Sequence, residues 1–286
     1  MTPAERAAGL PIWCGRVEPV PLKGGITNTN FLVVDRGRRC FVRVGQDIPV
    51  HGVLRFNELA AARAAEAAGI SPPIIHAEPG VLVTEFIEGH TFEAADVRAN
   101  LARIVPLVRR VHRELPKHLR GPVLAFWVFH VVRDYAATIG EGGHAAAAEL
   151  PRLLEIAAEL ERRVGAIDLV FGHNDLLPAN FIDDGSRLWL VDWDYAGFNS
   201  PLFDLGGLAS NNELSLEQED ELLARYYGRV ADSDLKRRYA AMKCASLLRE
   251  TLWSLVSELH SRLDFDFKAY TAENRCRFEA AWDAIQ

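Results

Sequence analysis

A change of pattern near residue 89 constrains the fold more than any other feature of this sequence. Before it, short apolar segments alternate with turn residues, which is typical of strands, and one Ala-rich helix is predicted to end at Gly69. After it, long segments with helical periodicity dominate. Strands and helices that are segregated along a chain predict an α+β fold with two lobes. We expect a small β-rich N-terminal lobe over residues 1–87 and a mainly helical C-terminal lobe over residues 88–286.

The individual elements follow from the same patterns. Strands are predicted at residues 18–22, 31–34, 40–44, 74–76 and 81–84, and again at 169–173, 181–182 and 188–192. Helices are predicted at residues 54–68, 97–114, 128–139, 145–164, 216–230 and 234–259.

Charge and hydropathy exclude several classes of function. The 286 residues carry a net charge of −7 without a basic block, which argues against binding of nucleic acid. The longest apolar segment, residues 123–132, is broken by His130 and is shorter than the roughly 20 residues of a membrane span, so no membrane insertion is expected. The four cysteines form no CxxC pair, and no secretory signal is seen, so we expect a cytoplasmic protein. The oligomeric state cannot be predicted.

One group of polar residues carries chemistry. Asp175 and Asn180 lie five positions apart after a predicted strand, and Asp192 ends the next strand but one. Phosphoryl transfer from ATP needs such a set, because one carboxylate takes the proton of the acceptor hydroxyl while an amide and a second carboxylate hold Mg²⁺. Each residue alone is an ordinary turn residue, but their order and spacing together predict a kinase.

These segments resemble the choline/ethanolamine kinase family, within the aminoglycoside-phosphotransferase-like kinases that have a protein-kinase-like fold. The matching segments are His173–Asp175 with Asn180, Asp192–Asn199, Phe203–Gly206 and a C-terminal region that includes Trp253 and Phe265–Phe278. The resemblance implies that Asp175 is the catalytic base, and that Asn180 and Asp192 bind magnesium and complete the catalytic set.

The same resemblance implies a nucleotide site in the N-terminal lobe. Arg43 stands where protein kinases carry their ATP-binding lysine, and Glu58 is its expected ion-pair partner. The remaining residues expected to bind ATP are Gly24, Gly25, Thr27 and Asn28 in a loop over the phosphates, with Glu85 and Ile87 at the adenine.

For the acceptor, the resemblance and the chemistry of ammonium groups suggest aromatic faces and carboxylates. The expected substrate-binding residues are Asp194, Tyr195, Asp204, Asn211, Glu250 and Trp253. Glu250 stands where eukaryotic choline kinases carry a second tryptophan, and Asn211 stands where an acidic residue is expected. One ring fewer and one carboxylate more favour an acceptor with N–H donors, such as ethanolamine, although choline stays open.

Other functions also remain open at this stage. An aminoglycoside phosphotransferase is the main rival, and a kinase for thiamine or another small alcohol is a further one. A catalytically dead nucleotide-binding protein is disfavoured, because Asp175, Asp192 and Arg43 are all present.

Overall fold

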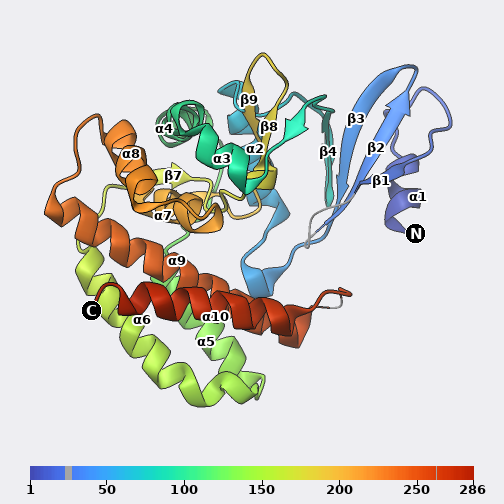
Figure 1. The fold of residues 1–286 in the computed structure, drawn as a ribbon. Helices are drawn as coiled ribbons and strands as arrows, with labels where there is room; N and C mark the ends of the chain where they lie inside the picture. Colours follow the sequence, from blue (N-terminus) through green and yellow to red (C-terminus); the bar gives the residue numbers. More distant parts are fainter. Residues whose placement is uncertain (23–27, 262) are drawn as a thin grey trace. The chain divides into compact units, whose positions relative to one another are not determined.

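The computed structural model describes residues 1–22, 28–261 and 263–286, and within them the chain forms two compact units. The first unit combines residues 1–92, 114–123 and 179–195, and the second combines residues 93–113, 124–178 and 196–286. Antiparallel strands characterise the first unit and helices the second, so the predicted α+β class is confirmed (Figure 1). The lobe boundary at residue 87 stays a prediction.

The first unit is built on two antiparallel sheets. One has the strand order β1-β2-β3-β5-β4, and the other has the order β6-β8-β9. The strands are β1 (Val20–Leu22), β2 (Thr29–Asp35), β3 (Arg38–Val44), β4 (Ile74–Glu78), β5 (Val81–Glu85), β6 (His90–Thr91), β8 (Phe181–Asp183) and β9 (Leu188–Leu190); the helical segments are α1 (Pro3–Ala8), η1 (Pro49–His51) and α2 (Arg55–Ala67).

Turn residues fix the register of the main sheet. Arg36 and Gly37 both have positive φ, at 49° and 84°, as a two-residue turn with the twist of a hairpin requires. This turn pairs Asp35 with Arg38 and sets the β2–β3 register along both strands. The strands predicted at residues 31–34 and 40–44 therefore form one hairpin.

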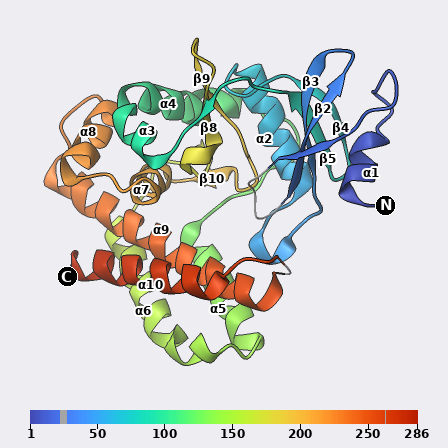
Figure 2. The same cartoon turned by 45° about the vertical axis from the view of Figure 1, so that its right-hand side comes forward.

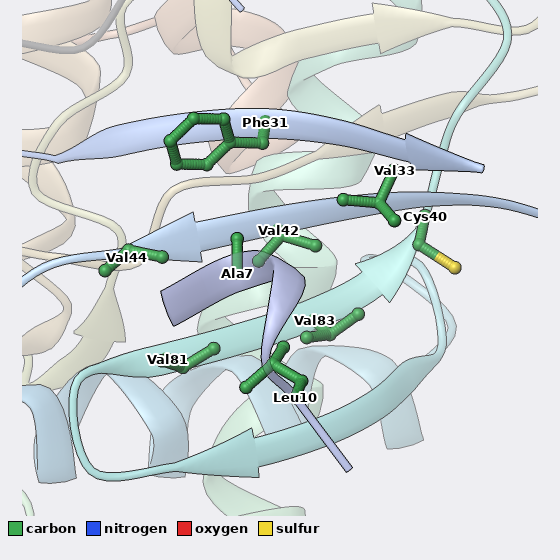
Figure 3. Close-up of a cluster of buried hydrophobic side chains, with 9 residues drawn as sticks. All are labelled: Ala7, Leu10, Phe31, Val33, Cys40, Val42, Val44, Val81 and Val83. Carbon is green, nitrogen blue, oxygen red and sulfur yellow. The ribbon is translucent and has the colours of Figure 1, made fainter. Parts of the chain in front are cut away.

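Period-2 alternation gives the middle of the main sheet one apolar face. The side chains on this face pack against α1, a helix that the sequence patterns did not predict (Figure 3). The cluster consists of Ala7, Leu10, Phe31, Val33, Cys40, Val42, Val44, Val81 and Val83. Because neighbouring residues of a strand point to opposite faces, Arg43 lies on the other face from Val42 and Val44.

The second unit is mainly helical. Its long helices α9 and α10 lie side by side in both views (Figures 1 and 2). None of the helices in the described ranges is long and apolar enough to span a membrane. The elements are α3 (Ala94–Ala99), α4 (Leu101–His118, which continues into the first unit), α5 (Val128–Glu141), η2 (Ala145–Glu149), α6 (Leu150–Val164), β7 (Val170–Gly172), η3 (Pro178–Asn180, which also continues into the first unit), β10 (Gly197–Asn199), α7 (Pro201–Asn211), α8 (Leu216–Tyr227), α9 (Ser233–His260) and α10 (Phe267–Asp283).

Candidate active site

Arg43 is the centre of a buried charge cluster in the first unit. It lies on β3 opposite Leu82 of β5, and only 7% of its surface is exposed. Its Nη1 pairs with Glu58 of α2 and lies 3.0 Å from Asp194 Oδ1, while its Nη2 lies 3.0 Å from Asp192 Oδ1. Burial opposes the charge on Arg43, but these carboxylates outweigh it and raise the pKa of the guanidinium.

The two predicted magnesium ligands flank the β8–β9 hairpin: Asn180 directly precedes β8, and Asp192 lies two residues after β9. Phe181 pairs with Leu190, and one residue beyond this pair the Val191 N–H donates to the Asn180 carbonyl at 3.0 Å. Asp192 follows directly, with a φ of 69° in the left-handed region that few residues other than glycine adopt. Desolvation raises the pKa of Asp192 despite the opposing pull of Arg43. Strained backbone of this kind is typical of functional sites.

Asp194 lies in the same charge cluster. Its Oδ1 contacts Arg43 and also Arg55, whose Nη1 is 2.8 Å away, and its Oδ2 accepts a hydrogen bond of 3.1 Å from Asn28 Nδ2. Arg55 was not singled out from the sequence, although its spacing of three residues from Glu58 is one at which helical side chains meet. The predicted role of Asp194 in binding the acceptor, and that of Tyr195 beside it, stay predictions.

The other residues predicted to bind nucleotide are placed as follows. Glu85 ends β5, where its backbone N–H already donates to Pro73 at 2.9 Å and its carboxylate pairs with Arg38. Ile87 follows the strand and is half-buried. Gly24, Gly25 and Thr27 lie outside the described residues, so their predicted contacts with phosphate stay predictions.

In the second unit, Asp204 holds the backbone of the loop that precedes Asp175. Its Oδ2 accepts from the His173 N–H at 2.9 Å, and its Oδ1 accepts from the Asn174 N–H at 2.6 Å. His112 Nε2 contacts the same carboxylate at 2.8 Å. Burial raises the pKa of Asp204, but the hydrogen bond and charge of His112 prevail and lower it. Asp204 is 2% exposed, and its predicted role in substrate binding stays a prediction.

Asn174 is fixed on every side. Its φ is 64°, its side-chain oxygen accepts from Asn199 Nδ2 at 3.1 Å, and its own Nδ2 donates to the Gly197 carbonyl at 3.2 Å. The β7–β10 pair supplies these partners, because Gly172 pairs with Gly197 at the end of the ladder. The neighbouring residue, Asp175, is therefore carried on a rigid loop.

Gly172 offers a test of this rigidity. A Cβ there would lie 3.0 Å from both Asn174 Oδ1 and Asp204 Oδ2, so Gly172→Ala should push the loop away from its anchors. We expect kcat of the predicted kinase reaction to fall by about tenfold or more, because Asp175 is the predicted base and small misplacements of a reacting group are costly. Gly185→Ala, in an open turn with positive φ, is the control for a general loss of stability. Unchanged kcat in Gly172→Ala would show that the loop tolerates displacement.

A small cavity of about 10 Å³ lies beside this loop. Asp175 lines it together with three of the predicted acceptor residues, which are Asp204 and Asn211 of α7 and Glu250 of α9. The complete lining is Asn174, Asp175, Leu176, Phe203, Asp204, Gly207, Asn211, Ser246, Arg249 and Glu250. A volume of this order accommodates about one water molecule.

Glu250 is held from two sides. Tyr270 of α10 donates its hydroxyl to Oε1 at 2.7 Å, and Arg249 Nη1 lies 2.8 Å from Oε2. Burial, followed by the charge of Glu250, raises the pKa of Tyr270, and the carboxylate of Asp175 contributes in the same direction. A carboxylate has about four acceptor positions, so Glu250 can accept further hydrogen bonds.

Trp253 belongs to an aromatic group on α9 and α10. It is 5% exposed, and its ring centroid lies 6.2 Å from those of Tyr270 and Phe267. Phe265 joins the group at 5.7 Å from Tyr270 and is 44% exposed. In the sequence, Tyr270 and Phe265 belong only to the C-terminal segment that resembles the family. Their contact with Trp253 depends on the packing of α10 against α9, which sequence spacing does not reveal.

Known proteins resemble this chain in sequence and in fold. Ethanolamine kinase 2 of Mus musculus is 26% identical over 279 residues, which cover 87% of this chain and 72% of that protein. The crystal structure of a choline/ethanolamine kinase family protein from Mesorhizobium loti has a TM-score of 0.79 and 28% identity, covering 97% of this chain and 92% of that one. A structure of LicA in complex with AMP has a TM-score of 0.81 and 23% identity, covering 99% and 97%.

The resemblance inferred from the motifs and the kinase-like fold are confirmed by these similarities. A family model described as the phosphotransferase enzyme family matches residues 18–242. Since this match spans well over half of the 286 residues, the chain belongs to the phosphotransferase enzyme family, with ethanolamine kinases among its relatives.

Proposed function

We propose that this chain is an ATP-dependent kinase that phosphorylates the hydroxyl of ethanolamine or choline. The observation that carries the proposal is the shared cavity of Asp175 and Glu250 in the second unit. One carboxylate is suited to take the proton of a hydroxyl, and the other is suited to an ammonium group. The ethanolamine kinase and the choline/ethanolamine kinase family protein among the similar proteins support the same acceptor class.

ATP and Mg²⁺ are the cofactors of the proposal. The AMP bound to the structurally similar LicA supports a nucleotide. The described residues contain no group of three or more His, Cys, Asp and Glu side chains that could hold a metal. Magnesium in kinases takes one or two protein oxygens and completes its shell with phosphates and water, so the carboxylate of Asp192 and the amide of Asn180 are a fitting donor set.

In the proposed reaction each residue has one task. Bound magnesium would neutralise the charge that develops on the phosphates. Arg43 grips phosphate oxygens with its planar guanidinium, held in place by Glu58. Asp175 orients the acceptor hydroxyl towards the γ-phosphorus and accepts its proton late, because the transition state of phosphoryl transfer is loose. Asp204 contributes by fixing the loop of Asp175.

The choice between ethanolamine and choline depends on Glu250. A primary ammonium donates hydrogen bonds that a quaternary one lacks, so Glu250→Gln should lower kcat/KM for ethanolamine by about tenfold while changing that for choline less. Glu250→Trp, which restores the aromatic residue of eukaryotic choline kinases, should raise the choline-to-ethanolamine ratio of kcat/KM. The ratio is measured by steady-state kinetics on both amines. If it is the same in both variants and in the unaltered protein, Glu250 does not select the acceptor.

The proposed function is tested by offering single acceptors to the purified protein. ADP release from MgATP is measured with choline, ethanolamine, thiamine and kanamycin, each against a blank without acceptor. We expect turnover with ethanolamine or choline that exceeds turnover with the other two by at least an order of magnitude. Turnover with kanamycin alone would make the protein an aminoglycoside phosphotransferase instead.

A further inference from the structure

Arg55 is a second cation in the charge cluster around Arg43. It is the first residue of α2, and its side chain is 12% exposed. Its Nη1 lies 2.6 Å from Glu58 Oε2 and 2.8 Å from Asp194 Oδ1, and its Nε donates to the Gln46 carbonyl at 2.9 Å. Its backbone N–H donates to Asp47 Oδ1 at 2.7 Å, which anchors the start of the helix. Both the backbone N–H and the guanidinium of Arg55 are therefore fixed by hydrogen bonds.

Arg43 and Arg55 share the same two carboxylates. Glu58 contacts Nη1 of Arg43 with its Oε1 and Nη1 of Arg55 with its Oε2. Asp194 contacts both Nη1 atoms with its Oδ1. Arg43 has one further ionic contact in the described part of the chain, from Nη2 to Asp192. Two guanidinium charges thus face three carboxylates, and Arg55 compensates the two that are not predicted to bind metal.

Removing Arg55 would change what surrounds Arg43. Glu58 and Asp194 would each lose a cationic partner within 3 Å and repel one another more strongly across Arg43. A single guanidinium would then have to compensate three buried or half-buried carboxylates. Its Nη2, which now lies against Asp192, would be drawn towards the other two.

We propose that Arg55 is a positioning residue for nucleotide binding. Arg55 neutralises part of the negative charge of Glu58 and Asp194. The Nη2 atom of Arg43 can then stay directed at Asp192 and at the phosphates of the nucleotide. This inference rests on the proposed function in one respect, because it takes Arg43 to be the phosphate-binding cation. Arg55 acts through Arg43 and needs no contact with the nucleotide.

The test compares Arg55→Gln with Arg55→Lys. We expect Arg55→Gln to raise KM for MgATP and the Kd of MgADP by about tenfold, with KM for the amino alcohol changed less than twofold. Arg55→Lys keeps a cation that can reach one carboxylate at a time and should recover part of this loss. Arg63→Gln, an exposed arginine on the same helix, is the matched control and should leave all three constants unchanged.

MgADP affinity is measured by calorimetry without acceptor, which separates this inference from the proposed function. If the unaltered protein binds MgADP but turns over no amino alcohol, the proposed function fails while Arg55 is still judged by the Kd of its variants. Unchanged MgADP affinity in Arg55→Gln would overturn the inference. A lowered Tm with unchanged KM and Kd would overturn it too, because the role would then be structural.

Discussion

Asp175→Asn should lower kcat by about two orders of magnitude or more, with ATP binding retained. The substitution removes the acceptor of the hydroxyl proton but keeps the size of the side chain, and general-base contributions are typically of this magnitude. The loop is anchored through the backbone N–H groups of His173 and Asn174, which the substitution does not alter, so the fold should persist. Steady-state kinetics with the best acceptor and calorimetric titration with MgADP measure the two quantities.

The control for this variant is Asp134→Asn, which alters an exposed aspartate on α5 of the same unit. It should leave kcat within twofold of the unaltered protein. If Asp175→Asn kept more than about a third of normal kcat, the assignment of Asp175 as the base would be wrong. If it lost MgADP binding as well, the variant would have damaged more than the acceptor side.

Asp204→Asn should strongly destabilise the protein. The amide can accept from only one of the two backbone N–H groups, and it leaves the His112 contact altered in a fully buried place. Breaking one partner of a buried charged network costs about 3–5 kcal/mol. We expect a loss of this size in the free energy of unfolding at pH 7, measured by urea denaturation.

The same variant gives a pH dependence whose sign follows from the lowered pKa of Asp204. A carboxylate with a depressed pKa in the folded state stabilises the protein above its unfolded pKa, about 3.9, and loses that contribution as the pH falls through the folded value. The difference in unfolding free energy between the two proteins should therefore shrink as the pH falls below about 4. A difference that grew as the pH fell below about 4 would contradict an ionised Asp204.

Short-range sequence signals located most of the elements that carry the site. The strand patterns at residues 169–173, 181–182 and 188–192 located the loop of Asp175 and the β8–β9 hairpin. Strands β2 and β3 and the Ala-rich helix α2 were predicted from the same kind of local pattern. These features depend on residues a few positions apart, and local chemistry decides them.

Elements that depend on tertiary packing were missed. Helix α7 contains Gly206 and Gly207, which lower its intrinsic helix propensity. Gly206 is nevertheless required, because a Cβ there would lie 2.9 Å from Lys243 Cα in α9. Helix α10 begins after Asp266, whose side chain accepts from the Ala269 N–H, and the sequence patterns did not predict this helix.

The same limit applies to the charged residues of the site. Asp204 was assigned from the sequence to the acceptor, yet its carboxylate is also the anchor of a loop about 30 residues away along the chain. The contact of Arg55 with Asp194 spans 139 residues and left no signal in the sequence. Long-range ion pairs of this kind become visible only when the fold is known.

Identification of the phosphorylated product tests the central claim most directly. The protein is incubated with MgATP and either ethanolamine or choline, and the mixture is followed by ³¹P NMR. The proposed function predicts a new phosphomonoester resonance that grows in a one-to-one ratio with ADP, is absent without amine, and is lost in Asp175→Asn. ATP consumption that yields only inorganic phosphate, or no ester with either amine while MgADP binds, would contradict it.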